Sequence, residues 1–365
     1  MRVARILIAT TALAAGASLI IATPAGAHTT KPLPTPTTTV LTTAVGAPFN
    51  LEVRHGRILV ADGGPGIIGK VKSDGTVQTL VSGAEGASGV ALSRNGKYLA
   101  YTHTVGGPPA GITDSGVTIE GPRAFKAAAD TLAYEKANNP DKVNHYGLAD
   151  PSQCTLDPNA PEGVPPLSYT GAIDSHAYSL TAFGNGFVLA DAGANALLRI
   201  SRSGTISTLA VLPPQPAKVT KAAAAGFGLN CTGDVVYNFE PVPTDVEVGG
   251  DGYLYVTTLP GGPEDPSFGA RGKVYRVNPW NGKVKEIAAG LSGPTNLAIS
   301  GGKLYVAEAF AGRISVIRHG SVAEYLPLPG ALAIEAGRGG TLYAATGIFG
   351  PPSVVRIDTH KGWRH

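Results

Sequence analysis

The chain has 365 residues, of which 49 are Gly and 29 are Pro, while charged residues make up only 15%. Gly and Pro punctuate short strands and turns, so this balance argues against a mainly helical protein and favours an all-β one. The formal net charge of +3 comes without a basic cluster, which argues against a nucleic-acid partner.

The N-terminus has the pattern of an export signal. Arg2 and Arg5 precede an apolar run from Ile6 to Ile21, and small residues of an A-x-A-like cleavage site end at Ala27. This pattern is typical of a secretory signal peptide over residues 1–27, cleaved before a mature chain that works outside the cytoplasm. A lone membrane anchor is the alternative, which the polar residues in the apolar run disfavour.

A Pro- and Thr-rich stretch, HTTKPLPTPTTT, follows at residues 28–39. It has no apolar periodicity, so it predicts an extended linker that need not pack against the rest of the protein. Folded structure is expected to begin at residue 40.

A repeated unit organises the remaining chain. Its clearest copy runs from Pro294 to Leu328 and divides into four short apolar strands, with Gly301-Gly302 and His319-Gly320 at two of the turns. Small turn residues between strands of this length are typical of antiparallel hairpins. Each unit therefore predicts one four-stranded sheet.

Six units of this kind follow one another. The last unit stops after its third strand at Ile357, and the N-terminal stretch Thr37–Val45 can supply the missing outer strand. Six such sheets predict a six-bladed β-propeller over residues 40–358, closed by the N-terminal strand and followed by a tail at 359–365. The first strands of the units are anchored at Asn50, Gly89, Ala177, Asp245, Asn296 and Ala331.

Two long gaps between anchors predict insertions at 103–174 and 212–243. The first contains Pro122–Asn139, whose apolar residues at helical spacing predict an amphipathic helix. Because both insertions connect one blade to the next, we expect both to cover the same mouth of the channel.

Each insertion holds one cysteine, Cys154 and Cys231, and the chain has no other. In an exported protein an even pair predicts a disulfide, here between the two insertions, with two buried free thiols as the alternative.

Four stretches resemble the ScyD/ScyE family of secreted six-bladed propellers, which are related in fold to NHL and gluconolactonase/senescence-marker propellers. The similarity covers nearly the whole mature chain but implies no established reaction. The two cysteines and the Pro-Thr linker depart from the family pattern. The stretches are ADTLAYEKANNPDKVNHYGL from Ala129, VLADAGANALLRISRSGTISTLAVLPP from Val188, PTDVEVGGDGYLYVTTLPGGP from Pro243, and GKVYRVNPWNGKV from Gly272.

Polar residues recur at the start of the first strands. Aligning the units places Asn50, Asp245 and Asn296 at equivalent positions, with His176 one place earlier in its own unit. First strands line a propeller's channel, so these groups can converge on a ligand, and their oxygens suit a divalent cation such as Ca²⁺. Alternatively, each caps its own turn or binds water.

A second polar column lies at the ends of the second strands. Aspartate and glutamate alternate there with threonine, and the column faces the same mouth as the first, which makes its acidic members ligand candidates. The alternative is that they satisfy backbone N–H groups of nearby turns. The column consists of Asp62, Thr102, Asp191, Thr258, Glu308 and Thr346.

These columns resemble the channel of the gluconolactonase and senescence-marker group, in which carboxylate and amide side chains hold a divalent metal. The glutamate of that group's first blade lacks a convincing counterpart here, because Glu52 lies two residues beyond Asn50 and deeper in the channel. Trp280, on a predicted turn, is a candidate for stacking on carbohydrate.

Two functions remain open, because propellers host both binding and catalysis. The sequence favours an exported, monomeric binding or scaffolding module for a small ligand or an extracellular protein. The alternative is a metal-assisted hydrolase or lactonase in the channel.

Overall fold

The computed structural model describes residues 36–107, 111–160, 166–226, 228–262 and 269–358. The predicted signal peptide at 1–27, most of the predicted linker and the tail at 359–365 lie outside the described residues. All described residues belong to one of the two units into which the chain divides, Thr35–His365.

Six four-stranded antiparallel sheets form most of this unit, and in each of them the strands are paired in the order in which the chain visits them, apart from the last, which β1 completes. The first three sheets are β2 Pro48–Arg54, β3 Arg57–Asp62, β4 Ile67–Val71 and β5 Val77–Ser82; β6 Val90–Leu92, β7 Leu99–Gly107, β8 Gly111–Gly121 and β9 Phe125–Asp130; and β13 Ala177–Phe183, β14 Gly186–Asp191, β15 Ala196–Ile200 and β16 Ile206–Val211. The other three are β20 Pro243–Val248, β21 Leu254–Thr258, β22 Gly272–Val277 and β23 Val284–Leu291; β24 Pro294–Ser300, β25 Lys303–Glu308, β26 Arg313–Arg318 and β27 Ser321–Pro327; and β28 Ala331–Ala336, β29 Leu342–Thr346, β30 Ser353–Asp358 and β1 Thr37–Thr42.

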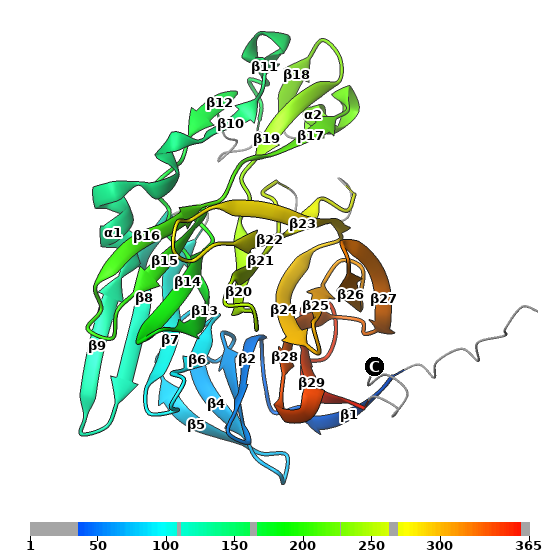
Figure 1. Cartoon of the computed structure of the whole chain (residues 1–365). Helices are drawn as coiled ribbons and strands as arrows, with labels where there is room; N and C mark the ends of the chain where they lie inside the picture. The colour runs from blue at the N-terminus through cyan, green and yellow to red at the C-terminus, as the bar shows by residue number, and fades with distance from the viewer. Residues whose placement is uncertain (1–35, 108–110, 161–165, 227, 263–268, 359–365) are drawn as a thin grey trace, which may run out of the picture. The chain divides into compact units, whose positions relative to one another are not determined.

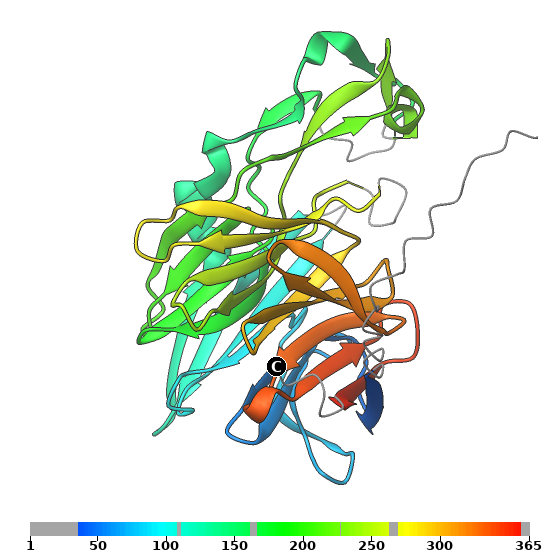
Figure 2. The same cartoon turned by 45° about the vertical axis from the view of Figure 1, so that its right-hand side comes forward.

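The first strands of these sheets contact one another in a closed ring, in which β2 contacts β6, and β13, β20, β24 and β28 follow in turn until β28 returns to β2. Figures 1 and 2 show these strands at the centre, with the fourth strands at the periphery. This arrangement confirms the predicted propeller and agrees with its six blades.

The last sheet is closed as predicted. Strand β1 pairs antiparallel with β30, so that Thr37 lies opposite Asp358 and Val40 opposite Val355. The pairing covers the outer edge of β30 with a strand from the other end of the sequence, which leaves β1 as the sheet's outer edge.

Buried side chains fill the space between neighbouring sheets. Along β14, Phe187 and Leu189 pack toward the second sheet, whereas Val188 and Ala190 pack toward the fourth. Successive side chains of a strand point to opposite faces, so a strand between two neighbours needs apolar residues on both faces. This explains why the second strands of the units are continuous apolar runs.

The helix predicted over Pro122–Asn139 is wrong in its first half. Residues Phe125–Asp130 form β9, in which Val117 of β8 lies opposite Ala129, and only Thr131–Asn138 form a helix, α1. The fourth strand of the second sheet outweighed local helix propensity because all six of its residues pair with Gly116–Gly121 of β8 and because it buries Ala129. The insertion therefore begins after Asp130, not at residue 103.

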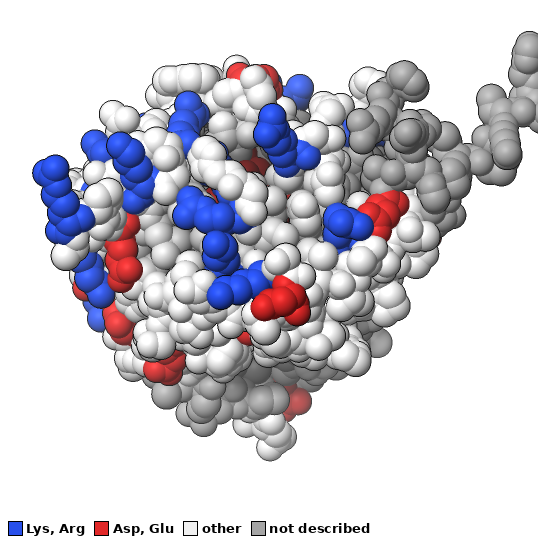
Figure 3. All heavy atoms as spheres, turned by 90° about the horizontal axis from the view of Figure 1, so that it is seen from below, with Lys and Arg blue, Asp and Glu red and all other residues white. Residues whose placement is uncertain are grey.

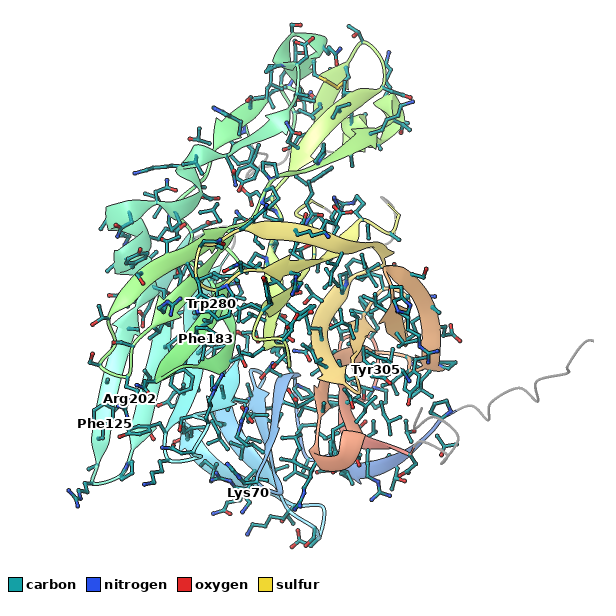
Figure 4. All side chains as sticks on the ribbon, viewed as in Figure 1. Lys70, Phe125, Phe183, Arg202, Trp280 and Tyr305 are labelled. Carbon is teal, nitrogen blue, oxygen red and sulfur yellow. A yellow bond between two sulfur atoms is a disulfide. The ribbon has the colours of Figure 1, made fainter. Side chains whose placement is uncertain are left out.

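The two insertions fold together. Strands from both form one four-stranded sheet with the order β12-β10-β19-β17. In addition, β11 pairs with β18 in a separate two-stranded sheet. Cys154 lies opposite Cys231 in that pair and is joined to it, which confirms the predicted disulfide, the yellow bond in Figure 4. The elements are η1 Pro140–Val143, β10 His145–Leu148, η2 Pro151–Gln153, β11 Cys154–Leu156, β12 Ser168–Thr170, β17 Gln215–Val219, α2 Lys221–Gly226, β18 Leu229–Cys231 and β19 Val235–Phe239; a further turn, η4, spans Arg338–Gly340.

Both insertions run from the fourth strand of one sheet to the first strand of the next. They therefore leave and rejoin the ring at the end where first strands begin, and the opposite mouth is free of them (Figure 1). No helix in the described residues is long and apolar enough to cross a membrane.

Candidate functional site in the central channel

A bulge near the start of most first strands sets which residues face each other around the channel. Asn50 lies opposite Ala61, and Ser179 lies opposite Ala190, each next to the last residue of the second strand. The predicted anchor Ala177 instead lies opposite Asp191, two residues too early. His176 therefore lies three residues before Ser179, which is the position equivalent to Asn50.

The three predicted metal ligands, Asn50, Asp245 and Asn296, tie neighbouring sheets together. Each side chain accepts a hydrogen bond from a backbone N–H of the next first strand around the ring, and Ser179 donates to Asp245. Buried polar groups that bind backbone in this way fix the register between blades. The bonds are Val90 N to Asn50 Oδ1 at 3.3 Å, Leu297 N to Asp245 Oδ2 at 2.8 Å and Ile334 N to Asn296 Oδ1 at 2.8 Å.

Within the described ranges, no three His, Cys, Asp or Glu side chains are placed so that they could hold one metal ion. Asn50 and Asn296 would contribute amide oxygens, which do not belong to these four residue types. Ca²⁺ binding by Asn50, Asp245 and Asn296 therefore stays a prediction.

The acidic members of the second column form hydrogen bonds with the segments that enter their sheets. Their carboxylates accept hydrogen bonds from backbone N–H groups just before the first strand of the same sheet. This contact agrees with the alternative that these residues satisfy backbone groups. Most of the donors lie about 15 residues earlier, and Asp191 also accepts from Ala194 N at 3.1 Å in the adjoining turn. The bonds are Gly46 N and Ala47 N to Asp62 at 2.8 and 2.6 Å, His176 N to Asp191 at 2.7 Å and Ser292 N to Glu308 at 2.5 Å.

His176 packs its ring edge-on against Tyr178, with the ring centroids 5.4 Å apart. Burial lowers the pKa of the imidazole, which the nearby carboxylate of Asp191 opposes. The lowered pKa favours the neutral form of this ring, which lies directly before β13.

A second tier of channel residues lies two positions farther along the first strands. Glu52 from β2, Glu247 from β20 and Glu335 from β28 line a cavity of about 760 Å³, together with Thr181, Arg54 and others. Two positions along a strand return a side chain to the same face, so this tier shares the channel with the first. The cavity lies at the ends of the first strands, away from the insertions.

These glutamates differ in their ion-pair and hydrogen-bond partners. Arg54 Nε lies 2.9 Å from Glu52 Oε1, and Leu92 N donates to the other oxygen at 2.9 Å. Burial raises the pKa of Glu247, and the neighbouring Asp245 and Glu52 raise it further. Burial likewise raises the pKa of Glu335, with further contributions from Glu247 and Glu52. The channel end therefore gathers three carboxyl groups, of which only Glu52 has an ion-pair partner among the described residues.

Sequence reasoning noted Glu52 but missed Glu247 and Glu335. The signal was present, because NLEV, DVEV and AIEA place a glutamate at corresponding points of three units. Only the strand register shows that Glu335 is equivalent to Glu52, since its unit was anchored two residues too early, at Ala331 rather than Ala333.

A second cavity, of about 660 Å³, lies outside the channel between the second and third sheets. The Arg202 guanidinium lies 5.1 Å from the Tyr98 ring centroid, and Phe125 meets that ring edge-on; Figure 4 shows Arg202 beside Phe125. Trp280 is 71% exposed and meets only Tyr253 edge-on at 6.0 Å among the ring contacts of the described residues. Its carbohydrate role stays a prediction.

Comparison with known proteins finds no matching family model and no matching curated protein. The solved structures do contain similar propellers. They include a streptogramin B lyase (13% identity, 89% of this chain and 97% of that chain, TM-score 0.53), a gluconolactonase from Xanthomonas campestris (13%, 92% and 99%, 0.53) and the PQQ-bound aldose sugar dehydrogenase of Streptomyces coelicolor (13%, 90% and 100%, 0.52).

At these identities the likeness concerns the fold alone. The resemblance to the ScyD/ScyE family rests on the sequence stretches quoted above. This chain is thus similar in architecture to propellers whose names indicate different chemistries.

Proposed function

We propose that this protein is an exported binding propeller that takes a small molecule with an ammonium or guanidinium group into the glutamate-lined end of its channel. The observation that carries the proposal is the approach of Glu52, Glu247 and Glu335, from three separate blades, to one cavity. A volume of about 760 Å³ lies within the range typical of small-molecule sites.

Charge balance supports a cationic ligand. Arg54 pairs with Glu52, whereas no ion pair to Glu247 or Glu335 occurs in the described part of the chain. Thr181 Oγ1 donates to Glu247 at 3.4 Å, and the backbone N–H of Ala336 donates to Glu335 at 2.7 Å. A ligand ammonium would replace repulsion between two carboxylates by charge-assisted hydrogen bonds.

The face around this mouth has mixed charge. Figure 3, seen from the side away from the insertions, shows Lys and Arg side chains gathered there with Asp and Glu side chains between them. Arg54 and Arg338 are among the residues that line the cavity. Selection for a cation therefore depends on the glutamates inside the cavity, not on the charge of the face.

Calorimetric titration of the mature chain with putrescine and with its uncharged analogue 1,4-butanediol tests this function. We expect putrescine to bind and butanediol not to bind, because only the diamine presents ammonium groups. Glu247→Gln and Glu335→Gln should each weaken putrescine binding about tenfold or more. Glu324→Gln, on the exposed face of β27, is the matched control and should leave binding unchanged. Equal binding of both compounds, or unchanged binding by both channel variants, would refute the proposal.

The alternative, a metal-assisted hydrolase, depends on Asp245. This carboxyl is buried at the same level of the channel as Asn50 and Asn296, and burial raises its pKa. Repeating the titration with Ca²⁺ separates the two functions. A heat of Ca²⁺ binding that is lost in Asp245→Asn but kept in Glu247→Gln would favour a metal site at Asn50, Asp245 and Asn296. That result would justify assays with lactones and esters.

A further inference from the structure

The junction between the first insertion and the third sheet holds a second acidic group, which the proposed function does not use. Glu135 lies on α1, and Asp141 lies one short turn later in η1. Their exposed fractions are 1% and 0%. Carboxylates are rarely buried this completely unless they are paired or bind a metal.

Several oxygens in this junction have no hydrogen-bond partner within the described residues. They are both carboxylate oxygens of Glu135, which lie near the Ser175 backbone N–H but outside hydrogen-bond geometry, Oδ1 of Asp141 and Oδ1 of Asn139. Leaving one buried acceptor unpaired costs about 1 to 3 kcal/mol, and more for a charged group. Four such oxygens from three residues within one helical turn and its extension indicate that a partner is missing.

The remaining polar atoms of these residues are held in place. Asn195 Nδ2 donates to Asp141 Oδ2 at 2.9 Å, and the Tyr146 hydroxyl donates to the same oxygen at 3.1 Å. Asn139 Nδ2 donates to the carbonyl of Gly171 at 2.9 Å. These bonds orient Asp141 and Asn139, so that their unpartnered oxygens keep defined directions.

Gly171 leaves room for this arrangement. A Cβ atom at that position would lie 1.8 Å from Asp141 Oδ1, so any larger residue would displace the carboxylate. The helix itself is anchored beside the group, because the Ser175 hydroxyl donates to Asp191 at 2.7 Å and forms a hydrogen bond with the Thr131 hydroxyl at 2.8 Å.

The junction gathers several acidic side chains. Burial, followed by the charges of Asp191, Asp174 and Asp141, raises the pKa of Glu135 to about 9. Burial and the charges of Asp141 and Asp191 raise the pKa of Asp174 to about 6. All the charged groups that act on these two carboxyls are acidic, so the junction lacks a compensating cation from the described side chains.

We propose that Glu135, Asn139 and Asp141 bind a Ca²⁺ ion at this junction, with Asp174 adding negative charge beside it. Carboxylate and amide oxygens are the donors that Ca²⁺ prefers, and water completes its coordination of about six to eight oxygens. The donor set is two carboxylates and an amide, unlike the clusters of three acidic, histidine or cysteine side chains, of which the described residues contain none. The ion would fasten α1 to the ring.

Terbium luminescence tests this site on the full mature chain. Tb³⁺ replaces Ca²⁺ at oxygen sites and emits when a nearby tyrosine is excited, and the Tyr146 hydroxyl already contacts Asp141. We expect a saturable Tb³⁺ signal that Ca²⁺ displaces. Glu135→Gln, a neutral isostere, should weaken both metals about tenfold or more, and Glu85→Gln, an exposed carboxylate, should not.

Two further variants keep the test decisive. Gly171→Ala should displace Asp141 and weaken Ca²⁺ binding, whereas Gly250→Ala, which meets no atom within 4 Å, should not. Glu247→Gln must leave the signal intact, which separates this site from the channel. Absence of Ca²⁺ binding by the wild type, or undiminished binding by folded Glu135→Gln and Gly171→Ala, would overturn the proposal.

Discussion

Two acidic regions of this protein differ in how they are enclosed. At the channel end, Glu247 and Glu335 line a cavity of about 760 Å³ that also contains Arg54. At the insertion junction, Glu135 and Asp141 are buried, and both oxygens of Glu135 and Oδ1 of Asp141 lack hydrogen-bond partners within the described residues. An open carboxylate site can admit a molecule, whereas a closed one can be neutralised only by a proton or a small ion. Enclosure, more than charge, therefore separates the two proposed ligands.

Removing the disulfide should have the largest effect on stability, and it should destabilise the two insertions but not the ring of sheets. Cys154 and Cys231 are separated by 77 residues, so on the chain-entropy model the bond contributes about 4 kcal/mol. In Cys154→Ala/Cys231→Ala we expect the insertion to open and become sensitive to protease while the ring stays folded. Limited proteolysis and calorimetry measure this. Loss of putrescine binding in the same variant would contradict the independence of the two regions.

The pH dependence of stability should test whether Glu247 in the channel keeps its proton in the folded chain. Because burial and neighbouring acids raise the pKa of Glu247 above its usual 4.5, the folded chain keeps this proton to a higher pH than the unfolded chain does. The stability that this proton contributes to the folded chain is therefore complete below the usual pKa of 4.5. It is lost as the pH rises through the raised pKa of the folded state. Glu247→Gln should raise the free energy of unfolding at pH 8 by about 1 kcal/mol or more, and should have little effect at pH 4.

Urea unfolding of the wild type and Glu247→Gln at both pH values measures this difference. Glu324→Gln, whose side chain lies on the exposed face of β27, should show no such pH dependence. A variant that is destabilised at pH 8 would show that Glu247 is already neutralised in the folded protein by a group other than a proton.

The smallest expected effect concerns Arg54. Its guanidinium pairs with Glu52 at 2.9 Å and competes with a cationic ligand for that carboxylate. Arg54→Gln should therefore strengthen putrescine binding, by roughly threefold for a partly exposed ion pair. Titration at low salt measures the change, with Arg356→Gln, which removes an ion pair to Asp358 on β30, as the control. Weaker binding would indicate that Arg54 contacts the ligand itself.

Much of the ring could be predicted from the sequence, because its information is local. The unit at Pro294–Leu328 alternates short apolar runs with Gly turns, and β24 to β27 appear where these runs lie. The pairing of Thr37–Thr42 with the last sheet followed from counting strands. The helix failed at Phe125–Asp130 because pairing with β8, a contact within a sheet, outweighed the helical spacing.

The candidate sites depended more on contacts between distant residues. Aligning the units placed Asn50, Asp245 and Asn296 at equivalent positions, but only the structure shows that each one accepts a hydrogen bond from a backbone N–H of a neighbouring blade. The unpartnered oxygens of Glu135 and Asp141 had no sequence signal, since α1 reads as an ordinary polar helix.

By itself, the sequence determined the propeller, its closure and the disulfide, because repeated strand patterns, turn glycines and a single pair of cysteines carry that information locally. Only the tertiary structure decided which polar residues hold blades together and which remain available to a ligand. That distinction depends on bulges that shift register by one residue and on enclosure by segments far apart in the chain, neither of which leaves a local pattern.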